Sequence, residues 1–276
     1  MTTETPQAKD KVTLQGEGFI DWSALTSINF AGTQMLIILG VAALVIAGIE
    51  LAVHLFRIPS YVFPAPSEIA SALVVSFPNL VPHILVTLQE LATGYLIGAL
   101  IGIILAAVIT QFPFIEKIIT PYILLLVTTP MVALVPLLIL KFGFGQTPRI
   151  IAIALASGPM VMINSSTGFR RTDAAKIALA RSYGATTLQI FQKVRFPLAL
   201  PMIIVGLMVG GIFGLTTCVG AEMVGGGMGL GTRLTYYSSL ARMAPFFAVI
   251  IIVAIIGISL YVLFYFIGKK WATWEA

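Results

Sequence analysis

The sequence predicts an all-α protein that crosses a membrane several times. Of its 276 residues, 58% are hydrophobic and only 10% are charged, and the mean hydropathy is +1.02. Soluble domains carry about 25% charged residues, so this composition excludes an ordinary soluble fold. The apolar runs are continuous, whereas a membrane β-barrel would show segments of about 10 residues that alternate polar and apolar. We therefore expect a bundle of helices within a lipid bilayer.

Six apolar segments are long enough to cross a hydrocarbon core about 30 Å thick. Charged residues or clusters of proline and glycine bound each of them. The expected spans cover residues 34–56, 81–110, 118–140, 147–167, 198–220 and 245–268. Pro130 and Pro136 are expected to kink the third of them, either as part of a gate or to shape the bundle. Together they predict one transmembrane domain over 34–270, between an N-terminal tail over 1–33 and a short tail over 271–276.

The Lys and Arg residues favour one side of the membrane. Six spans place both tails and the segment between the fourth and fifth spans on the same side, which holds 11 of the 16 Lys and Arg residues. The positive-inside rule predicts that this side is cytoplasmic. The net charge of +5 then follows from topology, so no nucleic-acid partner is needed to explain it. The first tail lacks the features of a cleaved signal peptide, and we expect it to be cytoplasmic.

The histidines and the cysteine give no metal or catalytic pattern. Cys218 is the single cysteine, which excludes an intrachain disulfide. His54 and His83 have no Cys, Asp or Glu at ligand spacing, so we expect no metal site. An intramembrane serine protease is disfavoured because neither histidine lies beside a Gly-rich serine turn.

A polar segment over 170–201 separates the fourth and fifth spans. Thr172 suits the cap of a helix, Asp173 suits its positive N-terminal end, and Gly184 suits a left-handed C-terminal residue. A second short helix is expected over 186–193. Several apolar side chains accompany these helices: Ile177, Leu179, Ala180, Tyr183, Leu188, Ile190 and Phe191. A free loop should expose less apolar surface, so the segment is predicted to dock on another protein.

The same segment resembles the "EAA" loop of bacterial ABC importer permeases. That motif reads Glu-Ala-Ala, three residues, Gly, nine residues, Ile, any residue, Leu-Pro. Here Ala-Leu-Ala at 178–180 is followed by Gly184 and then by Val-Arg-Phe-Pro at 194–197. Ala178 replaces the Glu of the motif and Phe196 replaces its Leu. The missing carboxylate implies that docking depends more on apolar packing and basic charge than is usual in the family.

Three further segments resemble the nitrate, sulfonate, taurine and bicarbonate branch of these permeases. They are Phe-Pro-Ala-Pro-Ser-Glu at 63–68, the Pro-containing segment 129–145 that begins in the third span, and Ala-Glu-Met-Val-Gly-Gly-Gly-Met-Gly-Leu-Gly at 221–231. The resemblance implies a type I importer permease in the bacterial inner membrane. Two copies would form the pathway, ABC ATPase subunits with their ATP and Mg would bind the loops, and a periplasmic or lipid-anchored binding protein would deliver the substrate.

The resemblance also assigns residues to the contact with the ATPase. The residues implied are Asp173, Ala178, Ala180, Arg181, Tyr183, Gly184, Ala185, Phe191 and Pro197. The chain has no cofactor site of its own in this reading, because the Gly cluster at 225–231 lacks the Gly-Lys-Ser/Thr of a phosphate-binding loop. That cluster is expected to form a tight turn or a gate.

Polar residues within the spans are candidates for the pathway. They are Thr128, Thr129, Asn164, Ser165, Ser166, Thr216, Thr217 and Glu222. Small hydroxyl groups either line a wet path or bond between helices, and both interpretations remain open. Glu222 is expected either to pair with Arg233 or Arg242 or to orient an anion at the mouth. Glu90 is a further candidate because an ionisable group in a span is costly.

The function expected from these features is ATP-driven import of a small anion such as nitrate, sulfonate, taurine or bicarbonate. Movement of the loops over 172–195 would switch the cavity between its inward-facing and outward-facing states. Relatives of this type also carry pyrimidines, flavins or aromatic acids, so these substrates remain alternatives. An ATP-independent channel or secondary transporter is less favoured, since paired inverted repeats are not evident.

Overall fold

The computed structural model describes residues 32–271, and every regular element in this part is helical. The predictions for residues 1–31 and 272–276 lie outside the described residues. The helices are α2 (Gly32–Leu55), α3 (Pro66–Gln111), α4 (Pro113–Thr128), α5 (Met131–Phe142), α6 (Gln146–Arg170), α7 (Ala174–Ser182), α8 (Thr187–Ile190), α9 (Phe196–Gly225), α10 (Leu230–Ser239) and α11 (Met243–Trp271). The all-α prediction is confirmed.

The chain divides into two compact units, the first ending at Leu51 and the second beginning at Ala52. Helix α2 supplies the described part of the first unit and is long and apolar enough to cross a membrane. Four helices of the second unit meet the same test, and α4 with α5 forms a sixth candidate if the bent pair counts as one span. The expected number of six is therefore reached only through a broken helix.

The third span, predicted as one kinked helix over 118–140, consists of two helices. Helices α4 and α5 meet at an angle of 98°. The break falls at Thr129 and Pro130, where Thr129 is extended with φ −81° and ψ 124°. Pro130 provides no backbone N–H, and its ring pushes the preceding residue out of the helical region. Proline was expected to kink this span, and it separates it into two helices.

The second predicted span, 81–110, is only part of a much longer helix. Helix α3 begins at Pro66 and runs for 46 residues, with Pro78 and Pro82 inside it. Pro66 occupies the first helical position, and the Glu68 carboxylate accepts a hydrogen bond from the Ala65 backbone N–H at 3.3 Å. Hydropathy marked where the apolar part begins, whereas the helix begins at these capping residues.

Helix α6 packs between α3 and α9, and these contacts are the most extensive in the second unit. Glycines at positions 94, 98 and 102 line α3, and glycines at 206, 210 and 214 line α9. A Cβ at Gly98 would lie 2.6 Å from the Ala154 carbonyl oxygen, and one at Gly210 would lie 2.7 Å from Val161 Cγ2. Such approach is possible only without side chains, as is common between membrane helices.

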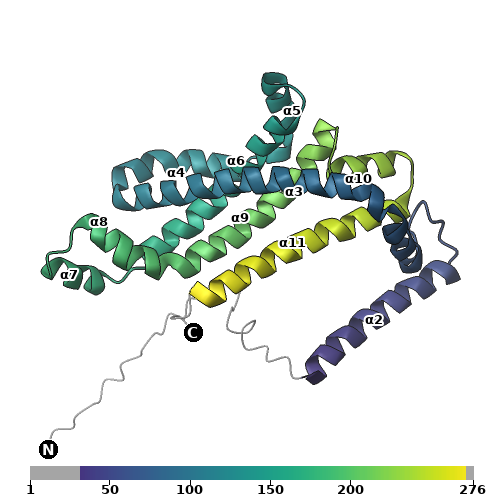
Figure 1. Cartoon of the computed structure of the whole chain (residues 1–276), viewed down its shortest axis with the longest axis horizontal. Helices are drawn as coiled ribbons and strands as arrows, with labels where there is room; N and C mark the ends of the chain where they lie inside the picture. The colour runs from purple at the N-terminus through teal and green to yellow at the C-terminus, as the bar shows by residue number, and fades with distance from the viewer. Residues whose placement is uncertain (1–31, 272–276) are drawn as a thin grey trace, which may run out of the picture. The chain divides into compact units, whose positions relative to one another are not determined.

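Helices α6 and α9 connect two different ends of this unit (Figure 1). At one end, called the loop end here, lies the segment over 170–197, which carries α7 and α8. It is named the coupling loop after the contact with an ATPase that the family resemblance implies. At the other, called the turn end, a Gly-rich turn over 226–229 joins α9 to α10. With a rise of 1.5 Å per residue, the 25 residues of α6 span about 37 Å between the two ends.

Candidate functional site

The first helix of the coupling loop is capped at both ends. Asp173 is its N-cap, and the Asp173 carboxylate accepts a hydrogen bond from the Ala175 N–H at 2.8 Å. Asp173 therefore takes the capping position that the sequence had given to Thr172, because the helix starts one residue later. At the other end Gly184 has φ +78°, Ala185 N–H donates to the Ala180 carbonyl at 3.1 Å, and Gly184 N–H donates to the Arg181 carbonyl at 2.9 Å. This pair of bonds is a Schellman motif.

The second helix of the loop begins with a reciprocal cap. Thr186 Oγ1 accepts from the Gln189 N–H at 3.3 Å, while Gln189 Oε1 accepts from the Thr186 N–H at 2.8 Å. A π-helical turn over 191–195 then leads into α9 without a break, so that Pro197 lies in the first turn of the membrane helix. The loop is thus a chain of capped helices joined directly to a span.

Large apolar side chains of the loop point into solvent. Leu179 is 59% exposed, Tyr183 is 84% exposed and Leu188 is 64% exposed. Two of the residues expected beside them behave differently: Ile190 is buried, and Phe191 is half-buried with its ring 5.1 Å from the ring of Phe169 in α6. Ile190 and Phe191 therefore anchor the loop to the bundle, and the exposed residues remain available to a partner.

The residues predicted to contact the ATPase are partly exposed to solvent and partly half-buried against the rest of the chain. The exposed ones are Asp173, Ala178, Arg181, Tyr183 and Gly184, and the half-buried ones are Ala180, Ala185, Phe191 and Pro197.

An ion pair between Glu116 of α4 and Arg170 at the end of α6, 2.5 Å long, lies beside the loop. Ser166, a predicted pathway residue, and this ion pair line a pocket of about 360 Å³ between α4 and α6.

The predicted pathway residues do not gather in one place. Ser165, Ser166, Thr217 and Glu222 are buried inside the chain, Asn164 and Thr129 are half-buried, and Thr128 and Thr216 are exposed on it. Most of their polar groups bond within their own helix. Thr216 Oγ1 donates to the Ile212 carbonyl at 3.1 Å, and Asn164 Nδ2 donates to the Met160 carbonyl at 2.8 Å. The polar groups of these residues are hydrogen-bonded to the backbone of the same helix, and the residues are still compatible with lining a water-filled pathway.

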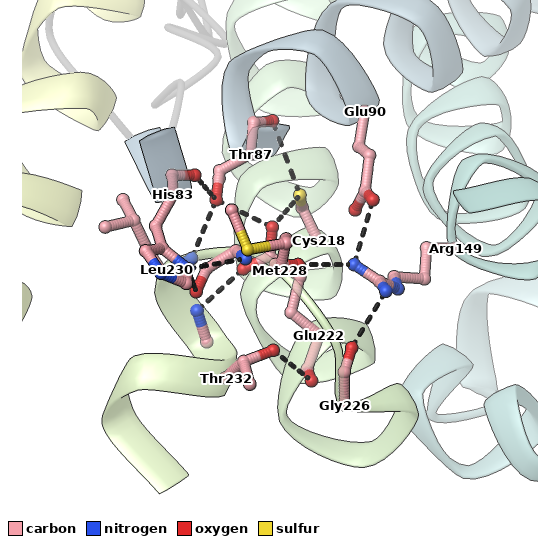
Figure 2. Close-up of polar contacts among 12 residues, drawn as sticks. His83, Thr87, Glu90, Arg149, Cys218, Glu222, Gly226, Met228, Leu230 and Thr232 are labelled. Atoms are coloured by element: carbon pink, nitrogen blue, oxygen red, sulfur yellow. Dashed lines mark hydrogen bonds and ion pairs between the residues drawn. The ribbon is translucent and has the colours of Figure 1, made fainter. Parts of the chain in front are cut away.

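The turn end contains a buried polar cluster, defined by His83, Thr87, Glu90, Arg149 and Glu222 (Figure 2). The three residues of α3 are spaced by four and then three positions, which places them on one face of the helix. Arg149 comes from the first turns of α6 and Glu222 from the last turn of α9. Three long helices thus contribute to one cluster around the Gly-rich turn.

Glu222 holds the N-terminus of α10. One carboxylate oxygen accepts from Thr87 Oγ1 at 2.6 Å, and the other accepts from the Gly231 N–H at 2.6 Å. Thr87 Oγ1 in turn accepts from the Leu230 N–H at 2.9 Å. A carboxylate suits this position because the amide groups at a helix start carry partial positive charge. The ion pair expected between Glu222 and Arg233 or Arg242 is therefore wrong.

Arg233 instead contacts His83. Arg233 Nε donates to His83 Nε2 at 2.8 Å, so that nitrogen carries no proton. The other ring nitrogen, Nδ1, contacts both the Gly229 carbonyl oxygen at 3.1 Å and the Gly229 N–H at 3.0 Å. His83 fixes the turn in this way, although its sequence neighbours gave no sign of a role.

Arg149 holds the two carbonyls of the turn. Nη1 donates to the Met228 carbonyl and Nη2 to the Gly226 carbonyl, each at 2.8 Å, and Nη1 also contacts Glu90 Oε1 at 2.8 Å. Arg149 is 4% exposed and Glu90 is fully buried. Gly226 and Gly227 have φ of +65° and +83°, a region that favours glycine, which explains the Gly run.

Three potential metal ligands meet in this cluster. Oxygens of Glu90 and Glu222 and the sulfur of Cys218 lie within 4.8 Å of one another. Both Glu222 oxygens accept from protein donors, however, and Arg149 already provides the positive charge beside Glu90. Protein donors therefore occupy Glu222, while one Glu90 oxygen, Oε2, has no hydrogen-bond partner among the described residues.

The family of the chain follows from comparison with known proteins. Residues 98–273 match the model of the "Binding-protein-dependent transport system inner membrane component" family. The chain belongs to this family. It is a permease subunit of an ABC importer, and ATP hydrolysis takes place in a separate chain. This assignment disfavours an ATP-independent channel or secondary transporter.

Several curated relatives cover most of the chain. A probable ABC transporter permease protein of Haemophilus influenzae is 30% identical over 74% of this chain and 83% of its own length. The riboflavin transport system permease protein RibX of Chloroflexus aurantiacus is 28% identical over 79% of this chain and 82% of its own. The taurine transport system permease protein TauC of Escherichia coli is 30% identical over 64% of this chain and 65% of its own. A sulfonate permease of Bacillus subtilis also matches, which supports the nitrate, sulfonate and taurine branch.

Solved structures confirm the fold. An amino acid ABC transporter chain aligns with a TM-score of 0.61 at 20% identity, over 71% of this chain and 96% of its own. A chain of the MetNI methionine ABC transporter aligns with a TM-score of 0.55 at 19% identity, over 69% of this chain and 91% of its own. The fold is that of type I importer permeases.

Proposed function

We propose that this chain forms half of the pathway of an ATP-driven importer and that a second copy forms the other half. ATPase subunits, which bind ATP and Mg, dock on the coupling loops from the cytoplasm, and a periplasmic or lipid-anchored binding protein delivers substrate at the turn end. The chain needs no cofactor of its own. The distribution of Lys and Arg supports this orientation and cytoplasmic termini.

The observation that carries the proposal is the architecture of the coupling loop. Its helices are capped at Asp173, Gly184 and Thr186, and they expose Leu179 and Tyr183. Exposed apolar groups on a rigid element suit a protein interface. Because α6 and α9 leave the loop directly, a displacement of the loop moves both helices as rigid rods. This supports alternating access driven by closure of the ATPases.

Substitution of Gly184 tests the proposal. Gly184→Val forces a β-branched residue into a left-handed conformation, which costs roughly 1–2 kcal/mol and favours a different helix end. We expect ATP-dependent uptake by the reconstituted complex to fall by about tenfold or more. The matched control is Gly184→Asn, since Asn tolerates this conformation and should keep most of the uptake. Normal uptake by Gly184→Val would contradict the proposed coupling.

The substrate we propose is a small anion such as taurine, another sulfonate, nitrate or bicarbonate. The support is the relation to taurine and sulfonate permeases. A flavin is the second candidate, because the riboflavin permease is similar over a larger part of the chain; a pyrimidine or aromatic acid ranks below it. Thr128 and Thr216, exposed on a single copy, are proposed to line the pathway between two copies.

Uptake by the complete complex distinguishes these substrates. The complex with its own binding protein is reconstituted in vesicles and offered labelled taurine, nitrate, bicarbonate or riboflavin. We expect ATP-dependent accumulation of one of the anions and none of riboflavin. Accumulation of riboflavin alone would assign the chain to flavin import.

A further inference from the structure

The Gly-rich turn at 226–229 and the start of α10 are held by two separate groups of side chains. His83, Thr87 and Glu222 bind the segment over 229–231. Both Glu222 oxygens, the Thr87 hydroxyl and both His83 ring nitrogens have partners. Each of these side-chain groups has a partner, so a displacement of this part would lose hydrogen bonds.

Within the described residues, Arg149 is the side chain that binds the first part of the turn, where the Gly226 N–H also donates to the Glu222 backbone carbonyl at 3.1 Å. Arg149 is shared between the Gly226 and Met228 carbonyls and a single oxygen of Glu90. Within the described residues, Glu90 Oε2 and Arg149 Nε have no hydrogen-bond partner although both are buried. A guanidinium group and a carboxylate in contact normally form two parallel hydrogen bonds, so this pair is incomplete in the observed conformation.

From this arrangement we infer that Arg149 is the latch of a two-state turn. In the observed state it holds the turn and makes one bond to Glu90. In the second state its side chain turns to form a bidentate pair with both Glu90 oxygens, and it releases Gly226 and Met228. The inference rests on the proposed function, in which the turn end faces the delivered substrate, and it names the element that opens there.

The free-energy cost of releasing the Gly226 and Met228 carbonyls is partly offset by a new bond to Glu90. Opening loses two bonds from Arg149 to the carbonyls, and the bidentate pair gains one bond by using the unpaired Arg149 Nε and Glu90 Oε2. The cost of release is thereby reduced, which keeps the two states close enough in free energy to be shifted. Residues 226 and 227, which have positive φ here, are glycines, and without a Cβ they can adopt other backbone conformations at little steric cost once the turn is released.

The latch is connected to the loop end by continuous helices. Arg149 lies in the first turns of α6, which ends at Arg170 beside the coupling loop, and Glu222 lies in the last turn of α9, which starts there. Displacement of the loop therefore reaches Arg149 and the turn through two packed helices. Glu90, on α3, keeps its place in both states, and Arg149 changes from one hydrogen bond to it to two.

Hydrogen exchange in the reconstituted complex tests this inference. Peptides covering 224–233 are measured in the nucleotide-free state and in the state trapped with ATP and vanadate. We expect amide exchange in this segment to be at least about fivefold faster in one of the two states, because the released turn loses its support. Equal exchange in both states would overturn the latch.

Two variants separate a latch from a purely structural bond. Glu90→Gln keeps an oxygen for Arg149 Nη1 but replaces the second acceptor by an amide N–H, so the bidentate state is removed. We expect resting exchange to stay as in wild type, the nucleotide-dependent change to disappear, and uptake to fall by about tenfold. Arg149→Lys cannot hold two carbonyls and Glu90 together, and should raise exchange already at rest.

A structural role predicts a different result, since both variants would then raise exchange at rest. Glu68→Gln, the same chemical change at the exposed start of α3, is the matched control and should behave as wild type. If Glu90→Gln raises amide exchange in the nucleotide-free state as Arg149→Lys does, the inference that Arg149 switches between two states is wrong. Failure of the wild-type complex to import any substrate with ATP counts against the proposed function, whereas import with unchanged exchange counts against the latch alone.

Discussion

The loop end and the turn end join the same two helices, α6 and α9, but they contrast in where their polar and apolar groups lie. At the loop end Leu179 and Tyr183 are apolar or aromatic and exposed. At the turn end Glu90, Arg149 and Glu222 are polar and buried. Exposed apolar surface requires a partner, whereas buried charge has to be satisfied within the fold. The contrast therefore supports the proposal that the loop end binds another protein, and it shows that the polar groups of the turn end bond within the fold.

The two ends also differ in the range of their contacts. In the coupling loop the capping bonds join residues two to five positions apart, such as Ala185 with Ala180. At the turn end the bonds join residues far apart, such as Glu90 with Arg149 and His83 with Arg233. The loop helices can consequently form from local sequence, while the turn exists only after α3, α6 and α9 have packed.

The largest expected effect comes from removing one arginine at each end. Arg149→Met removes the partner of Glu90 and the donors for two carbonyls, and should lower the free energy of unfolding by about 3–5 kcal/mol. The matched variant Arg170→Met breaks the partly exposed pair with Glu116 and should cost no more than about 1 kcal/mol. Thermal unfolding of the purified permease in detergent measures both. Equal losses would show that the two ends do not differ as described.

A second effect should appear in binding and not in stability. Tyr183→Ala removes an aromatic ring that is 84% exposed, so the isolated permease should keep its free energy of unfolding within about 0.5 kcal/mol. Its affinity for the ATPase should fall by about tenfold or more if Tyr183 lies in the centre of that interface. Phe191→Ala gives the comparison, since its ring packs on Phe169 and its loss should lower stability as well. Unchanged ATPase affinity in Tyr183→Ala would remove this residue from the interface.

The sequence predicted those features that depend on local chemistry. The cap at Gly184 and the second loop helix follow from glycine and threonine at fixed positions. The break at Pro130 was expected only as a kink, because the angle depends on what α4 and α5 pack against. The early start of α3 was missed since its first turns are polar, although Pro66 and Glu68 carry the capping signal.

The turn-end cluster was missed because its partners are far apart in sequence. Arg149 entered only the count of charges on each side of the membrane, and the pairing of Glu222 with Arg233 or Arg242, one of two alternatives, was wrong. One signal was present: His83, Thr87 and Glu90 form a polar stripe on an otherwise apolar helix. A stripe of this kind predicts a buried partner, but the identity of that partner requires the packing of three helices.

The smallest effect is expected at the N-cap of the coupling loop, where the difference between the two ends is sharpest. Asp173→Ala removes the acceptor for the Ala175 N–H and should destabilise α7 by about 1 kcal/mol. Because α7 contributes no buried side chain in the described structure, the melting temperature of the permease should not change. The loss should instead appear as about fivefold faster amide exchange over 174–182, with exchange over 224–233 unaffected. Asp173→Asn, which keeps a capping oxygen, should restore protection, and faster exchange at both ends in Asp173→Ala would show that the loop's local structure is not independent of the distant turn.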